Sequence, residues 1–208
     1  MPLGKTYSKK GLDNAQSQKI DKVERKVNKL YKSHKADLKY KDYTATGVAP
    51  GSTFVAYNIS DTAEGDAYGN RDGQKVCLKS LDLNLRMTQN ASSNVDAMRV
   101  MVLRWKSNCL ATVPTRAQVL EYNTVESHHT LAYKDEFNVL FDKTYSMKYL
   151  VDSIRLIRKH INLHNSYANH SGSATGNATD GHIFLCFFGV DAAYPSSIQI
   201  DSRITFSG

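Results

Sequence analysis

Histidines are the residues of this chain with the widest chemical range, and their spacing suits neither metal binding nor catalysis. His160 and His164 stand four positions apart in a segment of strand-like composition, where that spacing spans about 13 Å. His128 and His129 are adjacent, so on a strand their side chains would point to opposite faces. The sequence also lacks a glycine-rich phosphate loop, a GxSxG motif and an HExxH motif. We therefore expect no catalytic residues and no enzyme activity.

Carboxylates gather at one place where they could bind a hard cation. Asp61, Glu64 and Asp66 lie close together in a turn-rich segment. Oxygen ligands on loops suit an ion such as Ca²⁺, here at a junction between subunits. The alternative interpretation is an acidic loop that faces solvent. Apart from such a structural divalent cation, we expect no cofactor.

Phosphate binding is the chemistry that the first forty-one residues favour. Residues 1–41 hold twelve Lys and Arg against four acidic residues, a net charge of +8, whereas residues 42–208 hold fifteen against sixteen, a net charge of −1. Lysines contact phosphates without reading base sequence, so they indicate salt-sensitive, sequence-tolerant binding of nucleic acid. A merely solubilising tail is the alternative. The candidate nucleic-acid-binding residues are Lys5, Lys9, Lys10, Lys19, Lys22, Arg25, Lys26, Lys29, Lys32 and Lys35.

The charge step at residue 42 predicts two parts, a basic arm over residues 1–41 and a body over residues 42–208. Residues 1–17 have no apolar periodicity, so we expect them to be disordered. Residues 18–34 fit an amphipathic helix that is too short to be stable alone. We expect it to gain stability from arms of other subunits, from the body or from a bound polyanion. The apolar stripe that would make the subunit contact consists of Ile20, Val23, Val27 and Leu30.

Alternating apolar and polar residues predict β-strands in the body. Residues 81–88 and 198–206 alternate cleanly, and residues 182–190 form a continuous apolar run typical of a strand buried on both faces. A short helix is expected at residues 115–121. Eight strands with almost no helix favour an antiparallel sandwich or barrel. The strands are expected at residues 38–44, 53–59, 81–88, 98–106, 137–145, 153–164, 182–190 and 198–206.

Cysteine content and hydropathy limit where such a chain would work. Three cysteines without a CxxC spacing, together with no recognisable signal peptide, indicate a reducing compartment. The longest apolar run, residues 183–188, is far shorter than the roughly 18 residues of a membrane span. We therefore expect no membrane partner.

Five segments of the body carry motifs in a fixed order: GNRDGQKVCLKSLDLNLRM, AMRVMVLRWKSN, VPTRAQVLEYNT, DEFNVLFDKTYSM and GHIFLCFFG. The motif residues are Arg71, Gly73, Trp105, Pro114, Thr115, Val119, Leu120, Phe137, Val139, Leu140 and Asp142. In this order the segments resemble the single jelly-roll capsid proteins of circular Rep-encoding single-stranded DNA (CRESS-DNA) viruses. The coat proteins of satellite RNA viruses are similar in much of the pattern, including a basic N-terminal helix.

The resemblance implies an all-β, eight-stranded antiparallel jelly roll, a β-sandwich of which sixty copies assemble into a T = 1 icosahedral shell with the arm facing inward. It implies a viral coat protein that packages a single-stranded genome, DNA in the first family and RNA in the second. Such a protein resides in the virion and assembles in the host cytoplasm or nucleus. The arm departs from many DNA-virus members because it has eleven Lys and only Arg25, which leaves phosphate neutralisation as its expected role. A cellular jelly-roll module that binds carbohydrate is the alternative from another functional class.

Overall fold

The computed structural model describes residues 16–28, 38–93, 95–106, 113–148, 151–176 and 178–207, and it divides into two units, Met1–Leu38 and Lys39–Gly208. In the first unit, a helix covers residues 16–28. It begins two residues before the predicted helix, and residues 29–34 of that prediction lie outside the described residues. Most of the segment predicted to be disordered, residues 1–15, also lies outside them. No helix in the described ranges is long and apolar enough to cross a membrane.

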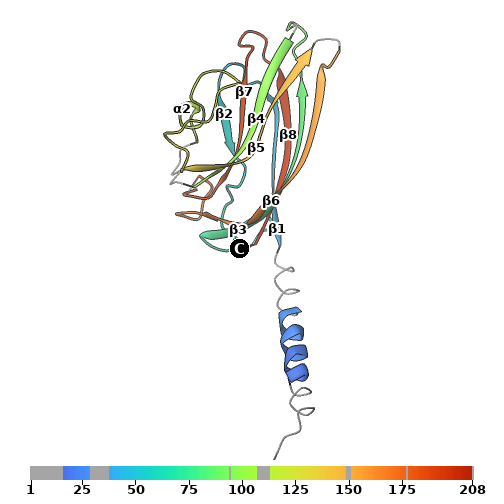
Figure 1. The fold of residues 1–208 in the computed structure, drawn as a ribbon, viewed down its shortest axis with the longest axis vertical. Coiled ribbons are helices and arrows are strands. Elements are labelled where there is room, and N and C mark those ends of the chain that lie inside the picture. Colours follow the sequence, from blue (N-terminus) through green and yellow to red (C-terminus); the bar gives the residue numbers. More distant parts are fainter. Residues whose placement is uncertain are drawn as a thin grey trace, which may run out of the picture. The chain divides into compact units, whose positions relative to one another are not determined.

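The second unit consists of eight strands in two four-stranded antiparallel sheets (Figure 1). Its elements are β1 (Lys39–Val48), β2 (Val55–Asn58), β3 (Lys75–Thr88), β4 (Val95–Trp105), α2 (Arg116–Val119), β5 (Phe137–Lys148), β6 (Ile154–Asn169), β7 (Ile183–Gly189) and β8 (Ser197–Ser207). One sheet has the order β1-β8-β3-β6, and the other has the order β2-β7-β4-β5. The first strand therefore pairs with the last, β2 with β7, β3 with β6 and β4 with β5. This is the topology of one long hairpin rolled into two sheets, so the predicted eight-stranded jelly roll is confirmed.

Alternation along the strands explains how the first sheet, β1-β8-β3-β6, meets the core. On β3, the leucines from Leu81 to Leu85 and Met87 are buried, while the residues between them are partly or fully exposed. On β8, the same alternation runs from Ile198 to Phe206. Each large apolar side chain that leaves water in this way contributes about 2 kcal/mol to folding. The hydrophobic core therefore lies between the two sheets, and the first sheet turns a polar face outward.

The second sheet, β2-β7-β4-β5, is covered on both faces. Leu185 and Phe187 of β7 pack into the core between the sheets, whereas Phe184 and Phe188 pack into a second apolar cluster. The segment at residues 113–136 contributes Val119, Leu120 and Val125 to that second cluster. This cover explains why β7 is buried along its whole length, as its continuous apolar run predicts.

Several strands are longer than the sequence pattern indicates, β3 and β6 most of all. β3 begins at Lys75 and not at residue 81, and β6 continues to Asn169. The pairing register shifts between Leu78 and Ser80, because β6 carries extra residues at that point. His164 and Asn165 have positive φ angles of 52° and 56° there. The irregularity disturbs the strict alternation on which the prediction rested.

Candidate nucleic-acid and assembly surfaces

The helix over residues 16–28 separates an apolar stripe from a basic face. Successive residues of a helix turn by about 100°, which places Ile20, Val23 and Val27 within about 60° of one another. Their side chains are 58%, 59% and 56% exposed. Lys22 and Arg25 lie on the opposite side of the helix, and Lys19 and Lys26 flank the stripe; all four cations are exposed. The helix therefore offers apolar surface to one partner and positive charge to another.

The remaining predicted arm residues fall outside the described part of the chain. For these residues, the nucleic-acid and subunit contacts stay predictions. They are Lys5, Lys9, Lys10, Lys29, Leu30, Lys32 and Lys35.

One cross-strand row on the outer face of the first sheet pairs its charged side chains with one another. In this row, Asp42, Arg203, Asp82 and His160 stand side by side on β1, β8, β3 and β6. Arg203 donates to both carboxylate oxygens of Asp42, at 2.6 and 2.7 Å, and these hydrogen bonds lower the pKa of Asp42. The Nδ1 atom of His160 lies 2.6 Å from an oxygen of Asp82. This row therefore adds little net charge to the face.

The neighbouring rows of this face contain arginines without such partners. Arg86 and Arg158 are exposed on β3 and β6. Alternation in the sequence predicts that Arg86 points outward, but no sequence signal indicated that it would stand near Arg158. With Asp201 on β8, the central rows hold three aspartates against three arginines. These central rows are therefore close to neutral, in contrast to the net charge of +8 of residues 1–41.

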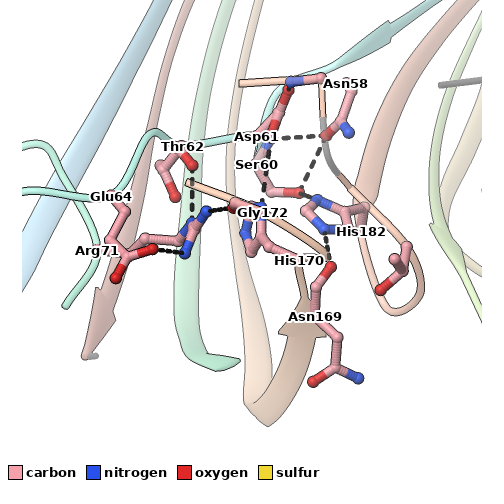
Figure 2. A network of polar contacts seen from close by, with 12 residues as sticks. Asn58, Ser60, Asp61, Thr62, Glu64, Arg71, Asn169, His170, Gly172 and His182 are labelled. Carbon is pink, nitrogen blue, oxygen red and sulfur yellow. Dashed lines mark hydrogen bonds and ion pairs between the residues drawn. The ribbon is translucent and has the colours of Figure 1, made fainter. Parts of the chain in front are cut away.

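Arg71, which begins the R-x-G motif, is a fully buried cation (Figure 2). Its Nε donates to the Thr62 carbonyl at 3.0 Å, its Nη1 to the Gly73 carbonyl at 2.5 Å, and its Nη2 to the Gly172 carbonyl. A carboxylate oxygen of Glu64 lies 3.4 Å from Nη1. Backbone carbonyls from separate loops thus hold this charge, so the motif arginine anchors loops and is not free to bind a ligand.

Two buried histidines lie beside Arg71 (Figure 2). The rings of His170 and His182 meet edge to face, with their centroids 4.6 Å apart. His182 donates through Nε2 to the Asn169 carbonyl at 2.8 Å, and its Nδ1 contacts the Ser60 hydroxyl at 3.0 Å. Neither ring nitrogen of His170 has a hydrogen-bond partner among the described residues. Burial, with smaller effects from the charges of His182 and Arg71, lowers the pKa of His170 to about 3, so the ring is neutral.

A second arginine fastens the segment that covers the second sheet. Arg99 of β4 donates to both carboxylate oxygens of Asp142 of β5, at 2.8 and 2.5 Å, and to the carbonyls of Val125 and Ser127, at 3.2 and 2.5 Å. The Nε2 atom of His129 lies 2.8 Å from Asp142. Partial burial alone would raise the pKa of Asp142, but the hydrogen bonds and charges of Arg99 and His129 outweigh it and lower the pKa to about 2. Asp142 of the F-x-V-L-x-D motif is therefore a structural anchor.

Other motif residues also hold the covering segment in place. The indole ring of Trp105 stacks on Phe137 with a centroid distance of 5.7 Å and an interplanar angle of 6°. At the start of α2, the Thr115 N–H donates to the side-chain oxygen of Gln118 at 2.9 Å, which satisfies one of the free N–H groups at the start of a helix. Arg71, Trp105, Phe137 and Asp142 of these motifs thus hold separate segments of the fold together.

The acidic loop has separate partners for its carboxylates. Asp61 accepts a hydrogen bond from the Gly176 N–H at 2.5 Å, Glu64 pairs with Arg71, and Asp66 is exposed. Within the described ranges, no group of three or more His, Cys, Asp or Glu side chains could hold a metal ion. A cation shared with a neighbouring subunit stays a prediction.

Comparison with known proteins finds similarity in fold at low sequence identity. No protein-family model and no curated protein matches the sequence. A solved structure from desmodium yellow mottle tymovirus is 15% identical, covers 82% of this chain and 87% of its own, and has a TM-score of 0.41. A structure from turnip yellow mosaic virus is 10% identical, covers 82% of this chain and 93% of its own, and has a TM-score of 0.41. The 60-mer BFDV capsid protein is 9% identical, covers 82% of this chain and 91% of its own, and has a TM-score of 0.31. The strand order of this chain, rather than these similarities, establishes the jelly roll.

Proposed function

We propose that this chain is a viral coat protein that assembles with copies of itself into a closed shell and packages single-stranded nucleic acid. The observation that carries the proposal is the joining, in one chain, of a near-neutral jelly roll to a separate unit rich in lysine. Jelly rolls are a fold of capsid domains. An arm of net charge +8 is suited to neutralise phosphates, with no requirement for a particular base sequence.

The finer form of the proposal is a T = 1 particle of sixty copies with a single-stranded DNA genome. It draws on the resemblance of five ordered body segments to capsid proteins of CRESS-DNA viruses. In that particle the apolar stripe of the helix, with Ile20, Val23 and Val27 exposed, would pack against the same stripe on neighbouring arms as a short coiled coil. The protein would then be a virion component that assembles in the host cell.

Purification of the full chain from a heterologous host tests the proposal. Size-exclusion chromatography and electron microscopy should reveal particles of about 1.4 MDa, the mass of sixty chains of 23.3 kDa. The ratio of absorbance at 260 and 280 nm should show packaged nucleic acid, and nuclease digestion of the extracted material should tell DNA from RNA. A small oligomer that binds glycans and no nucleic acid would contradict the proposal and favour the carbohydrate-binding alternative.

Charge removal from the helix tests the role of the arm. The variant replaces Lys19, Lys22, Arg25 and Lys26 by Gln, and the matched control replaces four exposed lysines of the jelly roll, Lys106, Lys134, Lys143 and Lys148. Each phosphate contact to a single strand contributes about 0.7 to the slope of log affinity against log salt, so the arm variant should lower the slope by about 3. An equal effect of the control would contradict a specific role for the arm.

A further inference from the structure

The outer face of the first sheet has a hollow of about 440 Å³ where β3, β6 and β8 lie side by side. The strands themselves form its floor. Its walls are the outward side chains of Asn84, Arg86, Leu156, Arg158, Gln199 and Asp201. We call this feature the Arg86–Arg158 hollow.

The two arginines of the hollow are free to bind a ligand. Elsewhere in the jelly roll, Arg71, Arg99, Arg155 and Arg203 each donate to an acidic side chain. Arg86 and Arg158 have no hydrogen-bond acceptor among the described residues, and both side chains are exposed. In the adjacent row, Arg203 donates to Asp42 and His160 contacts Asp82. Unpaired positive charge on the central part of this face is therefore concentrated in the hollow.

The strand register places the two arginines within reach of one ligand. Asn84 stands opposite Arg158, and Arg86 stands opposite Leu156. Arg86 and Arg158 are therefore diagonal neighbours on adjacent antiparallel strands, with Cβ atoms about 7 Å apart. Their long side chains can converge on one phosphate through charge-assisted hydrogen bonds.

The other walls of the hollow suit a nucleotide better than a free phosphate. Leu156 is 63% exposed and offers an apolar surface to the face of an unstacked base. On β8, Gln199 stands opposite Arg86 and Asp201 stands opposite Asn84. Amide groups and a carboxylate can accept hydrogen bonds from the edge of a base, whereas the carboxylate of Asp201 would repel a second phosphate.

We infer that the Arg86–Arg158 hollow is a second nucleic-acid contact, which holds the backbone phosphate of a single strand on its arginines and a splayed base on Leu156. The inference deepens the proposed function and rests on it. A duplex hides the faces of its bases, so the hollow prefers single strands. It supplies a localised contact on a sheet face whose central rows are otherwise close to neutral, and it is distinct from the diffuse charge of the arm.

Fluorescence anisotropy with the full chain and a labelled 20-mer single strand tests the inference. Arg86→Gln combined with Arg158→Gln should weaken binding about tenfold at moderate salt and lower the salt slope by about 0.7, the contribution of one phosphate contact. Arg203→Gln is the matched control, because this arginine lies on the same face but is paired with Asp42, and it should change affinity less than twofold. Leu156→Ser should weaken single-strand binding about threefold and leave the salt slope unchanged.

Several outcomes of this experiment would overturn the inference. One is equal affinity of the double variant and the Arg203→Gln control. Another is an unchanged affinity of the Leu156→Ser variant for the single strand. A third is competition by tripolyphosphate that is as strong as competition by the oligonucleotide, because the ligand would then be a free polyphosphate. If the double variant forms particles and packages nucleic acid as well as the unmodified chain, the inference fails but the proposed function stands. If the unmodified chain forms no particles, the proposed function itself fails.

Discussion

At the scale of single residues, Arg71 shows how this fold accommodates a charge without solvent. The side chain is fully buried, and removing a guanidinium from water costs several kcal/mol unless its donors are satisfied. Carbonyls of Thr62, Gly73 and Gly172 accept hydrogen bonds from it. Arginine suits this position because its planar fork presents five donors in fixed directions, which one ammonium group cannot reproduce.

Replacement of Arg71 is expected to destabilise the jelly roll strongly. Arg71→Lys and Arg71→Met should each lower the free energy of unfolding by about 3 kcal/mol or more, because several buried carbonyls lose their donor. Urea denaturation measures the effect. Arg203→Met is the control, since the pair of Arg203 with Asp42 is half exposed and should contribute far less to stability than a buried pair. Equal losses for the two positions would contradict the anchoring role.

His170 is expected to make the jelly roll less stable as the pH falls. The pKa of the buried ring is about 3, against an ordinary value of 6.5, so the unfolded chain accepts a proton that the folded chain refuses. The contribution of this ring is therefore complete above pH 6.5 and is lost as the pH falls toward 3, by about 1.4 kcal/mol per pH unit. Burial also lowers the pKa of His182, which acts in the same direction.

The variant His170→Phe tests this pH dependence. It keeps a ring of similar size, and His170 has no hydrogen-bond partner among the described residues to lose. Urea denaturation between pH 4.5 and 7.5 should give a shallower fall in stability for the variant than for the unmodified chain. His128→Phe is the control, because that ring is exposed, and it should leave the fall in stability as it is in the unmodified chain. Identical slopes for all three proteins would show that His170 is not buried as described.

At the scale of elements, periodicity predicted all eight strands. The predicted ends of some strands differ from the observed ends where the pairing is locally irregular. The alternation of residues 81–88 and 198–206 survives in β3 and β8 because one face of each strand packs on the core. The missed first part of β3 lies beyond the register shift at Leu78 and Ser80. A bulge depends on how two strands fit together, so neither strand alone carries a signal for it.

The helix over residues 16–28 is the element whose apolar stripe most needs a partner. Val27→Asp places a charge in the centre of the stripe beside Ile20 and Val23, and we expect it to reduce the yield of assembled particles severalfold, as measured by sedimentation. Asn28→Asp is the matched control, since it adds the same charge at the next position, about 100° away around the helix. Normal assembly of the Val27→Asp protein would contradict a packing role for the stripe.

At the scale of the whole molecule, the net positive charge lies in the arm and not in the jelly roll. The arm carries +8 and residues 42–208 carry −1. Sixty arms would supply about 480 positive charges, whereas each nucleotide carries one negative charge. A genome of one or two kilobases would therefore be neutralised only in part by the arms.

Packaging is thus expected to depend on added cations. Particles assembled on a 1,000-nucleotide single strand, in chelator and without polyamine, should retain about eight nucleotides per subunit, and spermidine or Mg²⁺ should raise this number toward about 17. The ratio of phosphate to protein in purified particles measures it. Full loading in the absence of small cations would show that the chain itself supplies charge beyond the arm.

The sequence by itself determined the features that depend on neighbouring residues. These are the period-two strands, the continuous apolar run of β7 and the charge step near residue 42. Each of them depends only on the residue types within one short segment of the chain. Only the tertiary structure decided that Arg71 is buried, that Asp142 is an anchor and that Arg86 and Arg158 stand together without an acceptor. These properties depend on residues far apart in sequence, such as Gly172 for Arg71, and the rolled hairpin brings them together.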